Sequence, residues 1–353
     1  MENLSYLFNI VIAMLVGFLL GALLIAWGGY DPILAYASLV DTSLNVSDPY
    51  YIAMTLSFTT PVMLTALTFA VGVRAGLFNI GAEGQVYMGA LGAIMVASLK
   101  LPPTLYLPLA ILVGSLLGGL WGLIAGLFKA LRNVNEVVST IMLNWIAFWI
   151  VEYARVYVYF NPLRAEKTIS MPPPGRLPII VPGSELSLSY VISLATVVIV
   201  YFIIWNTRLG YNIRVTGISY HAAKYSGANP TLTTLYAFVL GGLVSGLAGV
   251  LEICGRPPEY AITTGASNLA GLGFDGIAVS LIGLNHPLLI IPASIVIGML
   301  SAGSRGMQIR AGVPLELVKG VQGLIIISLA VPGFTYMLKR IKLKRSLRGV
   351  EGA

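Results

Sequence analysis

Long apolar stretches without a charged residue constrain this chain more than any other feature. Runs of about 20 such residues recur along the sequence, for example at 6–28, 105–128 and 232–251. A helix of that length spans the hydrocarbon core of a bilayer and satisfies its own backbone hydrogen bonds there. Only 10% of the residues are charged, against about 25% in soluble domains. We therefore predict an all-α integral membrane protein, and we exclude a soluble domain, a disordered chain and a lone nucleic-acid-binding domain.

The number of apolar runs predicts about ten transmembrane helices. The first run is too long for the core of a signal peptide and lacks a basic leader, so we expect it to remain as a membrane anchor. The single cysteine, Cys254, cannot form an internal disulfide. The ten runs are 6–28, 51–71, 84–99, 105–128, 137–160, 188–205, 232–251, 269–284, 287–302 and 317–338.

Basic residues are concentrated in two segments, which predicts the orientation in the membrane. One segment holds Arg208, Arg214 and Lys224, and the other is the tail 339–353, with six basic residues and one acidic residue. Lys and Arg beside spans mark the cytoplasmic side. We therefore expect a multi-pass protein of the plasma membrane with both termini cytoplasmic, a transmembrane domain at 1–338 and a basic cytoplasmic tail. Attraction of the tail to anionic lipid fits the same residues equally well.

Two of the ten runs, 84–99 and 269–284, are only about 16 residues long, which is short for a full crossing. Similar sequences precede them, AGLFNIG at 75–81 and AGLGFDG at 270–276. In the predicted topology the first approaches from inside and the second from outside. Short, glycine-interrupted spans in corresponding halves indicate broken helices and an inverted repeat.

The connection 161–187 contains six prolines and lies outside in this topology. Such a density of proline forbids a regular helix and favours extended backbone. The segment is either a docking surface for an extracellular partner or a stiff cover, and the residues fit both.

The sequence offers no set of catalytic or metal-binding residues. The glycines at 271, 273 and 276 match a dinucleotide fingerprint, but no strand precedes them. No phosphate-binding loop with a Gly-Lys pair occurs, so we expect no ATP site in this chain. His221 and His286, the two histidines, lie on different connections and cannot form a metal cluster or a triad. We predict a protein that is not an enzyme and binds no metal or cofactor itself.

Glycines recur every fourth residue at 114, 118, 122 and 126 within one apolar run. Small residues at that spacing form a bare stripe along a helix, which allows another helix to approach closely. We interpret the stripe as a packing surface.

The segment 76–85, GLFNIGAEGQ, places Asn79, Glu83 and Gln85 among apolar spans at the start of a short helix. Polar groups inside a membrane are costly unless they have partners, and they commonly line a pathway. Alternatively, Asn79 and Glu83 satisfy the free backbone amides at the start of the helix. The residues support both interpretations.

The inside connection 206–231 contains a short helix that Ser219 can cap and that Gly227 and Pro230 can end. A helix of two turns is unstable alone in water. We therefore expect it to pack on the bilayer surface or on a partner protein, with Ala222 and Ala223 on the buried face and Lys224 nearer the rim.

At these segments the chain resembles the permease subunits of ATP-binding-cassette importers of the ribose and nucleoside type, and the resemblance runs almost end to end. The segment 76–85 is similar to the nucleoside branch, whereas sugar permeases usually carry an aspartate-containing Gly-Gly-Ile-Asp-Leu-Ser-type segment there. The other matching segments are 135–144 (NEVVSTIMLN), 207–210 (TRLG), 222–227 (AAKYSG), 273–279 (GFDGIAV) and 318–325 (VKGVQGLI).

The resemblance implies a ten-helix permease that pairs with a second permease, as a homo- or heterodimer. It also implies two cytoplasmic ATPase subunits, which bind ATP and magnesium, and an extracellular lipoprotein that delivers a small-molecule substrate. The coupling helix is then expected within 208–229. Its candidate residues are Arg208, Gly217, His221, Ala222, Ala223, Lys224 and Gly227.

The function that we expect is uptake of a nucleoside or a related purine or pyrimidine compound by alternating access. The candidate pathway residues are Asn79, Glu83, Gln85, Asn144 and Asp275, with Phe78 offering a stacking face to a base. Uptake of ribose or another simple sugar is the alternative within the same class. A proton-coupled secondary carrier that uses Glu83, Glu152 or Asp275 is the alternative from a different class.

Overall fold

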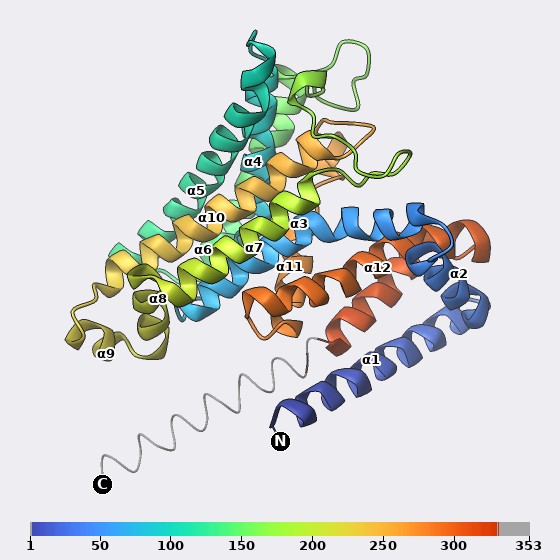
Figure 1. Ribbon diagram of the computed structural model, residues 1–353, viewed down its shortest axis with the longest axis horizontal. Helices are drawn as coiled ribbons and strands as arrows, with labels where there is room; N and C mark the ends of the chain where they lie inside the picture. The colour runs from blue at the N-terminus through green and yellow to red at the C-terminus, as the bar shows by residue number, and fades with distance from the viewer. Residues whose placement is uncertain (1, 330, 332–353) are drawn as a thin grey trace.

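Helices make up almost all of the regular structure (Figure 1). The computed structural model describes residues 2–329 and 331, and in these it contains isolated β-bridges but no strands. This confirms the all-α class, while the basic tail 339–353 lies outside the described residues. The helices are α1 (Glu2–Trp27), α2 (Pro32–Leu44), α3 (Pro49–Arg74), α4 (Ala82–Ala97), α5 (Tyr106–Arg132), α6 (Glu136–Tyr153), α7 (Ser189–Asn206), α8 (Arg208–Ile218), α9 (Tyr220–Tyr225), α10 (Pro230–Gly255), α11 (Leu272–Ile282), α12 (Pro287–Ala311) and a helical stretch at 315–329.

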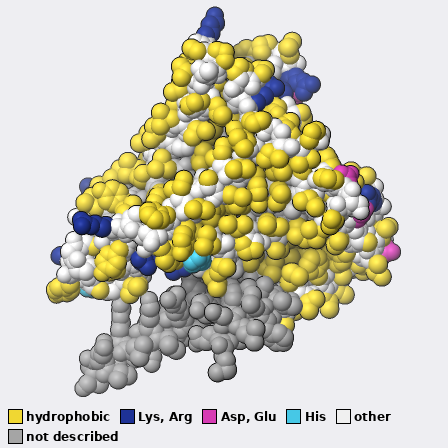
Figure 2. Space-filling view, viewed as in Figure 1, with side chains coloured by type: hydrophobic (Ala, Val, Ile, Leu, Met, Phe, Trp, Pro, Cys, Tyr) yellow, Lys and Arg dark blue, Asp and Glu magenta, His cyan; other side chains and the backbone are white. Residues whose placement is uncertain are grey.

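Within the described part of the chain, six helical segments are long and apolar enough to cross a bilayer. They are Pro49–Arg74, Pro103–Arg132, Glu136–Val158, Ser189–Asn206, Pro230–Gly255 and Pro287–Ala311. Each of the ten predicted runs contains a helix; α1 in the first run has 26 residues, whereas α4, α11 and the stretch at 315–329 are shorter within the described residues. The multi-pass helical architecture is therefore confirmed, and the count of ten spans remains a prediction. Figure 2 shows apolar side chains over most of the visible face, as expected for a surface that contacts lipid.

The short helices α4 and α11 have 16 and 11 residues, as the short apolar runs predict. They run in opposite directions. The chain after α4 contacts Tyr106, which packs against Gly175 of the proline-rich segment 161–187. The turn after α11 is instead held by Arg74, beside the helices α7 and α8.

The segment 30–50, which has three aspartates and no basic residue, contains a helix, α2. The side chain of Asp31 accepts hydrogen bonds from the amides of Ile33 and Leu34 and so caps its start. Pro32 occupies the first helical position, where its missing N–H costs nothing.

The glycine stripe of α5 packs against α4 and α10, as predicted. A Cβ at Gly118 would lie 2.5 Å from the carbonyl oxygen of Gly242, and one at Gly114 would lie 2.6 Å from that of Gly89. Any side chain at these positions would displace a neighbouring backbone. The backbones of the three helices are therefore in direct contact along this stripe.

The proline-rich segment 161–187 forms one 3-10 turn, at Pro173–Gly175, and is otherwise irregular. It lies at the opposite end of the molecule from α8 and α9 (Figure 1). Its Glu185 binds Arg256 at 2.9 Å and Arg305 at 3.0 Å, and so ties the segment to the ends of α10 and α12. Burial alone would lower the pKa of the Arg256 guanidinium, but the carboxylates of Glu252 and Glu185 raise it overall.

Candidate functional site

The amino-terminal ends of α4 and α11 meet at the side chain of Glu83, which is 4% exposed. Its carboxylate accepts hydrogen bonds from the backbone amides of Gly271 and Gly273, each at 2.6 Å, and from the hydroxyl of Tyr87 at 2.8 Å. Gly271 precedes α11 with φ at +90°, a conformation that favours glycine. One carboxylate thus joins the starts of two short helices that are almost 190 residues apart in sequence.

Two buried asparagines complete this junction. The Oδ1 atom of Asn79 accepts from the amide of Gly81 at 2.9 Å. The side chain of Asn144, on α6, accepts from the amide of Gly84 at 2.9 Å and donates to the carbonyl of Ile80 at 3.0 Å. Both side chains therefore satisfy backbone groups where α4 begins, which is the capping role that the sequence allowed.

Two side-chain amide atoms in this cluster, the Nδ2 atom of Asn79 and the Oε1 atom of Gln85, have no hydrogen-bond partner among the residues that the structure describes. Both side chains are 1% exposed. They approach each other at Gly81, where an added Cβ would lie 2.9 Å from Asn79 Oδ1 and 3.2 Å from Gln85 Nε2. One unpaired donor and one unpaired acceptor thus belong to neighbouring buried side chains, in an interior where polar groups ordinarily have partners.

Phe78 and Asp275 flank this cluster. Phe78 is half-buried and packs edge-on against Phe69, with ring centroids 4.9 Å apart. Asp275 is half-buried in the first turn of α11. The structure therefore brings Asn79, Glu83, Gln85 and Asn144 together and leaves Phe78 and Asp275 at the edge.

Sequence reasoning did not identify three hydroxyl groups near this junction. Tyr87 binds Glu83 from one helical turn away, and this i, i+4 spacing was the available signal. Thr68 of α3 and Ser245 of α10 lie 2.7 Å apart, and Thr68 also donates to the carbonyl of Gly241. The sequence did not single out Thr68 and Ser245, because isolated hydroxyl groups within apolar runs commonly form hydrogen bonds within their own helix.

The connection 206–231 forms two helices, α8 and α9. Ser219 caps α9 as predicted, accepting from the amide of Ala222 at 3.3 Å. Gly227 has φ at +82° after the helix, but Asn229 and Pro230 begin α10 instead of ending α9. The other candidate residues of this connection that are exposed are Arg208, Gly217, His221, Ala222 and Lys224.

The expectation that both alanines face a partner is wrong for Ala223. This residue is fully buried within the chain itself, where its carbonyl accepts from the amide of Ala228 at 3.0 Å. The neighbouring Ala222 is exposed. Adjacent residues of a helix point in directions about 100° apart, and in α9 this turns Ala223 toward the rest of the chain while Ala222 stays exposed.

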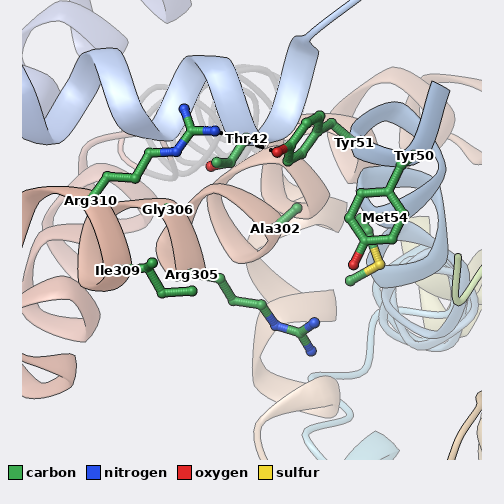
Figure 3. A pocket seen from close by; sticks show the side chains of 9 residues that line it. All are labelled: Thr42, Tyr50, Tyr51, Met54, Ala302, Arg305, Gly306, Ile309 and Arg310. Carbon is green, nitrogen blue, oxygen red and sulfur yellow. Dashed lines mark hydrogen bonds between the residues drawn. The ribbon is translucent and has the colours of Figure 1, made fainter. Parts of the chain in front are cut away.

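A pocket of about 260 Å³ lies between α2, α3 and α12, away from the Glu83 junction (Figure 3). Two of its arginines are paired, Arg305 with Glu185, and Arg310 with Asp41 and the hydroxyl of Tyr51. It includes none of the predicted pathway residues. Among the residues that the structure describes, no group of three His, Cys, Asp or Glu side chains could hold a metal ion.

Comparison with known proteins identifies the family. Residues 51–330 match the family described as branched-chain amino acid transport system / permease component. The guanosine ABC transporter permease protein NupP of Bacillus subtilis is 35% identical over 333 residues, which cover 93% of this chain and 94% of that protein. The nucleoside permease NupB of Lactococcus lactis is 32% identical, covering 91% and 90%, and the glucose permease TsgB13 of Haloferax volcanii is 28% identical, covering 92% and 87%. This chain therefore belongs to the permease family of ATP-binding-cassette transporters that carries this description.

Proposed function

We propose that this chain is the permease subunit of an importer for nucleosides or related purine and pyrimidine compounds. Alternating access in this subunit is driven by ATP hydrolysis on separate subunits. The 35% identity to a guanosine permease over 93% of the chain is the observation that carries the substrate class. In this proposal the chain crosses the plasma membrane ten times with both termini cytoplasmic.

The pathway passes the Glu83 junction. Glu83 and Asn144 hold the helix ends, because all their described contacts are with this chain's own backbone or with Tyr87. The unpaired Asn79 Nδ2 donor and Gln85 Oε1 acceptor are complementary to a nucleobase edge, which presents acceptors and donors side by side. Phe78 offers a ring face at the edge of this cluster, and base–aromatic stacking is tolerant of base identity.

The α8–α9 connection contacts the cytoplasmic ATPase. Its outer surface combines the basic Arg208 and Lys224 with exposed aromatic side chains, including Tyr220 at 55% and Tyr225 at 94% exposure. Exposed aromatic rings rimmed by charge are typical of protein interfaces. The assembly also includes a second permease, homo- or heterodimeric, and an extracellular binding lipoprotein, with ATP and magnesium held by the ATPase.

Uptake of a simple sugar is the second candidate, since the glucose permease is 28% identical over 92% of the chain. A proton-coupled carrier is less well supported. Of its three candidate acids, Glu83 accepts hydrogen bonds from three donors of this chain and Glu152 is paired with Arg155 at 2.9 Å, which leaves Asp275 as the candidate for a proton relay.

Uptake of radiolabelled guanosine into vesicles containing the chain and its partner subunits tests the proposal. We expect uptake that requires ATP and that unlabelled uridine and adenosine inhibit. Equal inhibition by glucose or ribose would favour the sugar permease. Uptake without ATP that a protonophore abolishes would favour the secondary carrier.

Two variants test the pathway residues. Gln85→Met removes the unpaired acceptor while keeping the length of the side chain, and should reduce uptake by about tenfold, the loss typical of one unmade hydrogen bond. Gln308→Met is the control, because it makes the same change in α12, where the Gln308 side chain bonds, among the described residues, only to the Ser304 carbonyl of its own helix. Unchanged uptake in Gln85→Met would exclude a role in substrate recognition.

A further inference from the structure

The indole of Trp205 lies in the last turn of α7 and contacts four charged or aromatic side chains. One of them comes from the preceding turn of α7, and the other three come from other parts of the chain. Arg74 of α3 lies 5.1 Å from the ring centroid and Arg214 of α8 lies 5.7 Å from it. Tyr201 stacks on the ring at 5.4 Å with an interplanar angle of 18°, and His286 meets it edge-on at 4.7 Å. We call Arg74, Tyr201, Trp205, Arg214 and His286 the Trp205 cage.

The cage holds the turn that joins α11 to α12. Arg74 donates from Nε to the carbonyl of Asn285 at 3.0 Å and from Nη2 to that of Leu284 at 3.4 Å. Leu284 and Asn285 have φ values of +55° and +52°. Two successive residues with side chains in this region are disfavoured, so the turn persists because its surroundings impose it.

The helix α8 also touches the segment that leads to α4. A Cβ at Gly217, near the end of α8, would overlap the carbonyl oxygen of Arg74 and lie 2.8 Å from the amide of Gly76. Gly76 itself has φ at +77°, and a Cβ there would lie 3.1 Å from the Cα of Gly217. No side chain separates the two backbones, so a displacement of α8 must displace this turn as well.

The contact of α8 with Gly76 and the contact of the Trp205 cage with the turn at 283–286 both involve segments that adjoin the short helices. The turn at Gly76 begins the segment that ends at Glu83, and the turn at 283–286 follows α11, whose start is bonded to Glu83. The helix α8 therefore contacts the segment that leads into α4 directly, and it reaches the turn after α11 through Trp205, while Glu83 joins the starts of the two short helices.

We propose that the Trp205 cage is the positioning site that transmits movement of α8 to the short helices α4 and α11. The proposal rests on the proposed function, in which α8 and α9 contact the ATPase. The contacts within the Trp205 cage are suited to transmitting a movement. The Nε atom of Arg214 and the Nδ1 atom of His286 are buried and make no hydrogen bond within the described residues, so ring contacts hold them. Cation–π contacts tolerate lateral displacement better than hydrogen bonds, whose strength falls steeply with angle.

Hydrogen exchange on the purified chain tests the physical connection without any transport. Arg214→Gln removes a cation that does not touch the turn at 283–286. We expect exchange of the Asn285 and His286 amides, bonded to Ser280 and Gly283 in the folded chain, to rise roughly tenfold or more. The control is Arg132→Gln, at the exposed end of α5. Unchanged exchange in Arg214→Gln would overturn the proposal.

Substitution of the ring tests the coupling of hydrolysis to uptake. In the assembled transporter, Trp205→Leu should retain ATP hydrolysis but take up roughly tenfold less substrate per ATP hydrolysed. Trp205→Phe keeps an aromatic ring for the two arginines, so it should restore part of the uptake per ATP. Trp149→Leu, at a residue 65% exposed on α6, is the matched control. Uptake per ATP that is unchanged in Trp205→Leu, or that Phe does not restore, would contradict a positioning role. Absence of nucleoside uptake by the unmodified transporter, with the exchange result intact, would count against the proposed function alone.

Discussion

Replacing Glu83 with glutamine separates the two roles that this residue can have. The carboxylate accepts from three donors, the amides of Gly271 and Gly273 and the hydroxyl of Tyr87. A glutamine side chain of the same size offers one acceptor oxygen and one NH₂ group. Because the NH₂ group must face one of the two glycine amides, that amide loses its acceptor.

The expected cost follows from the hydrogen bonds. A bond to a charged acceptor contributes about 1.5–3 kcal/mol, and a buried donor left unpaired costs about 1–3 kcal/mol. Glu83 is 4% exposed, so water cannot replace the lost acceptor without opening the junction. We therefore expect Glu83→Gln to destabilise the chain by roughly 2–4 kcal/mol. The control is Glu316→Gln, at an exposed position, with an expected effect within about 0.5 kcal/mol.

The chain supplies its own reporter for this measurement. Cys254 is the single cysteine and is fully buried, so a thiol-reactive fluorophore should react with it only as the helices separate. The midpoint of thermal unfolding should fall by about 4 °C or more in Glu83→Gln and stay nearly constant in the control. If Glu83→Gln unfolds at the wild-type temperature but loses uptake, then the carboxylate contacts substrate and our account of the junction is wrong.

Three further predictions concern packing, pH and topology. Gly89→Ala should destabilise the chain by about 1–3 kcal/mol in the same thermal assay, because the methyl group overlaps the backbone of α10, whereas Gly323→Ala, with no atom within 4 Å of the added Cβ, should not destabilise it. Burial, and then the charge of Arg74, hold the pKa of His286 below its ordinary 6.5, so folding disfavours protonation of this side chain. The stability of the folded chain should therefore fall as the pH drops through and below 6.5, and it should fall by less in His286→Gln. Single cysteines at Ser47 and Ser226, in a cysteine-free background, should react with an impermeant thiol reagent applied outside intact cells only at Ser47, and labelling of Ser226 would overturn the predicted orientation.

The short helices and their polar junction could be predicted from the sequence because their signals are local. The amides and carboxylate at 76–85 stand out in apolar surroundings, and glycines mark the breaks. The lengths of the two apolar runs then predict α4 and α11. The sequence also left open whether Glu83 caps a helix or lines a pathway, and the structure shows it capping α11, a helix to which it does not belong.

The contacts between distant segments could not be predicted in this way. Nothing in the sequence around Gly271 indicates that its amide would donate to the carboxylate of Glu83, 188 residues earlier in the chain. Trp205 and Arg74 lie at helix ends, where aromatic and basic residues are common in membrane proteins, so the sequence did not distinguish a cage from an interfacial anchor. The burial of Ala223 likewise depends on the return of the chain through Ala228.

Electrostatics explains why a carboxylate is needed where α4 and α11 meet. The amino-terminal end of each helix carries a partial positive charge of about half an elementary charge, and two such ends facing each other in a medium of low dielectric repel. Glu83 lies in the first turn of α4, and Asp275 lies in the first turn of α11. While the ends are together, Glu83 compensates both and satisfies the amides of α11. If alternating access separates the two helices, each keeps an acidic residue of its own, so the separation costs hydrogen bonds at Gly271 and Gly273 without leaving either helix end uncompensated.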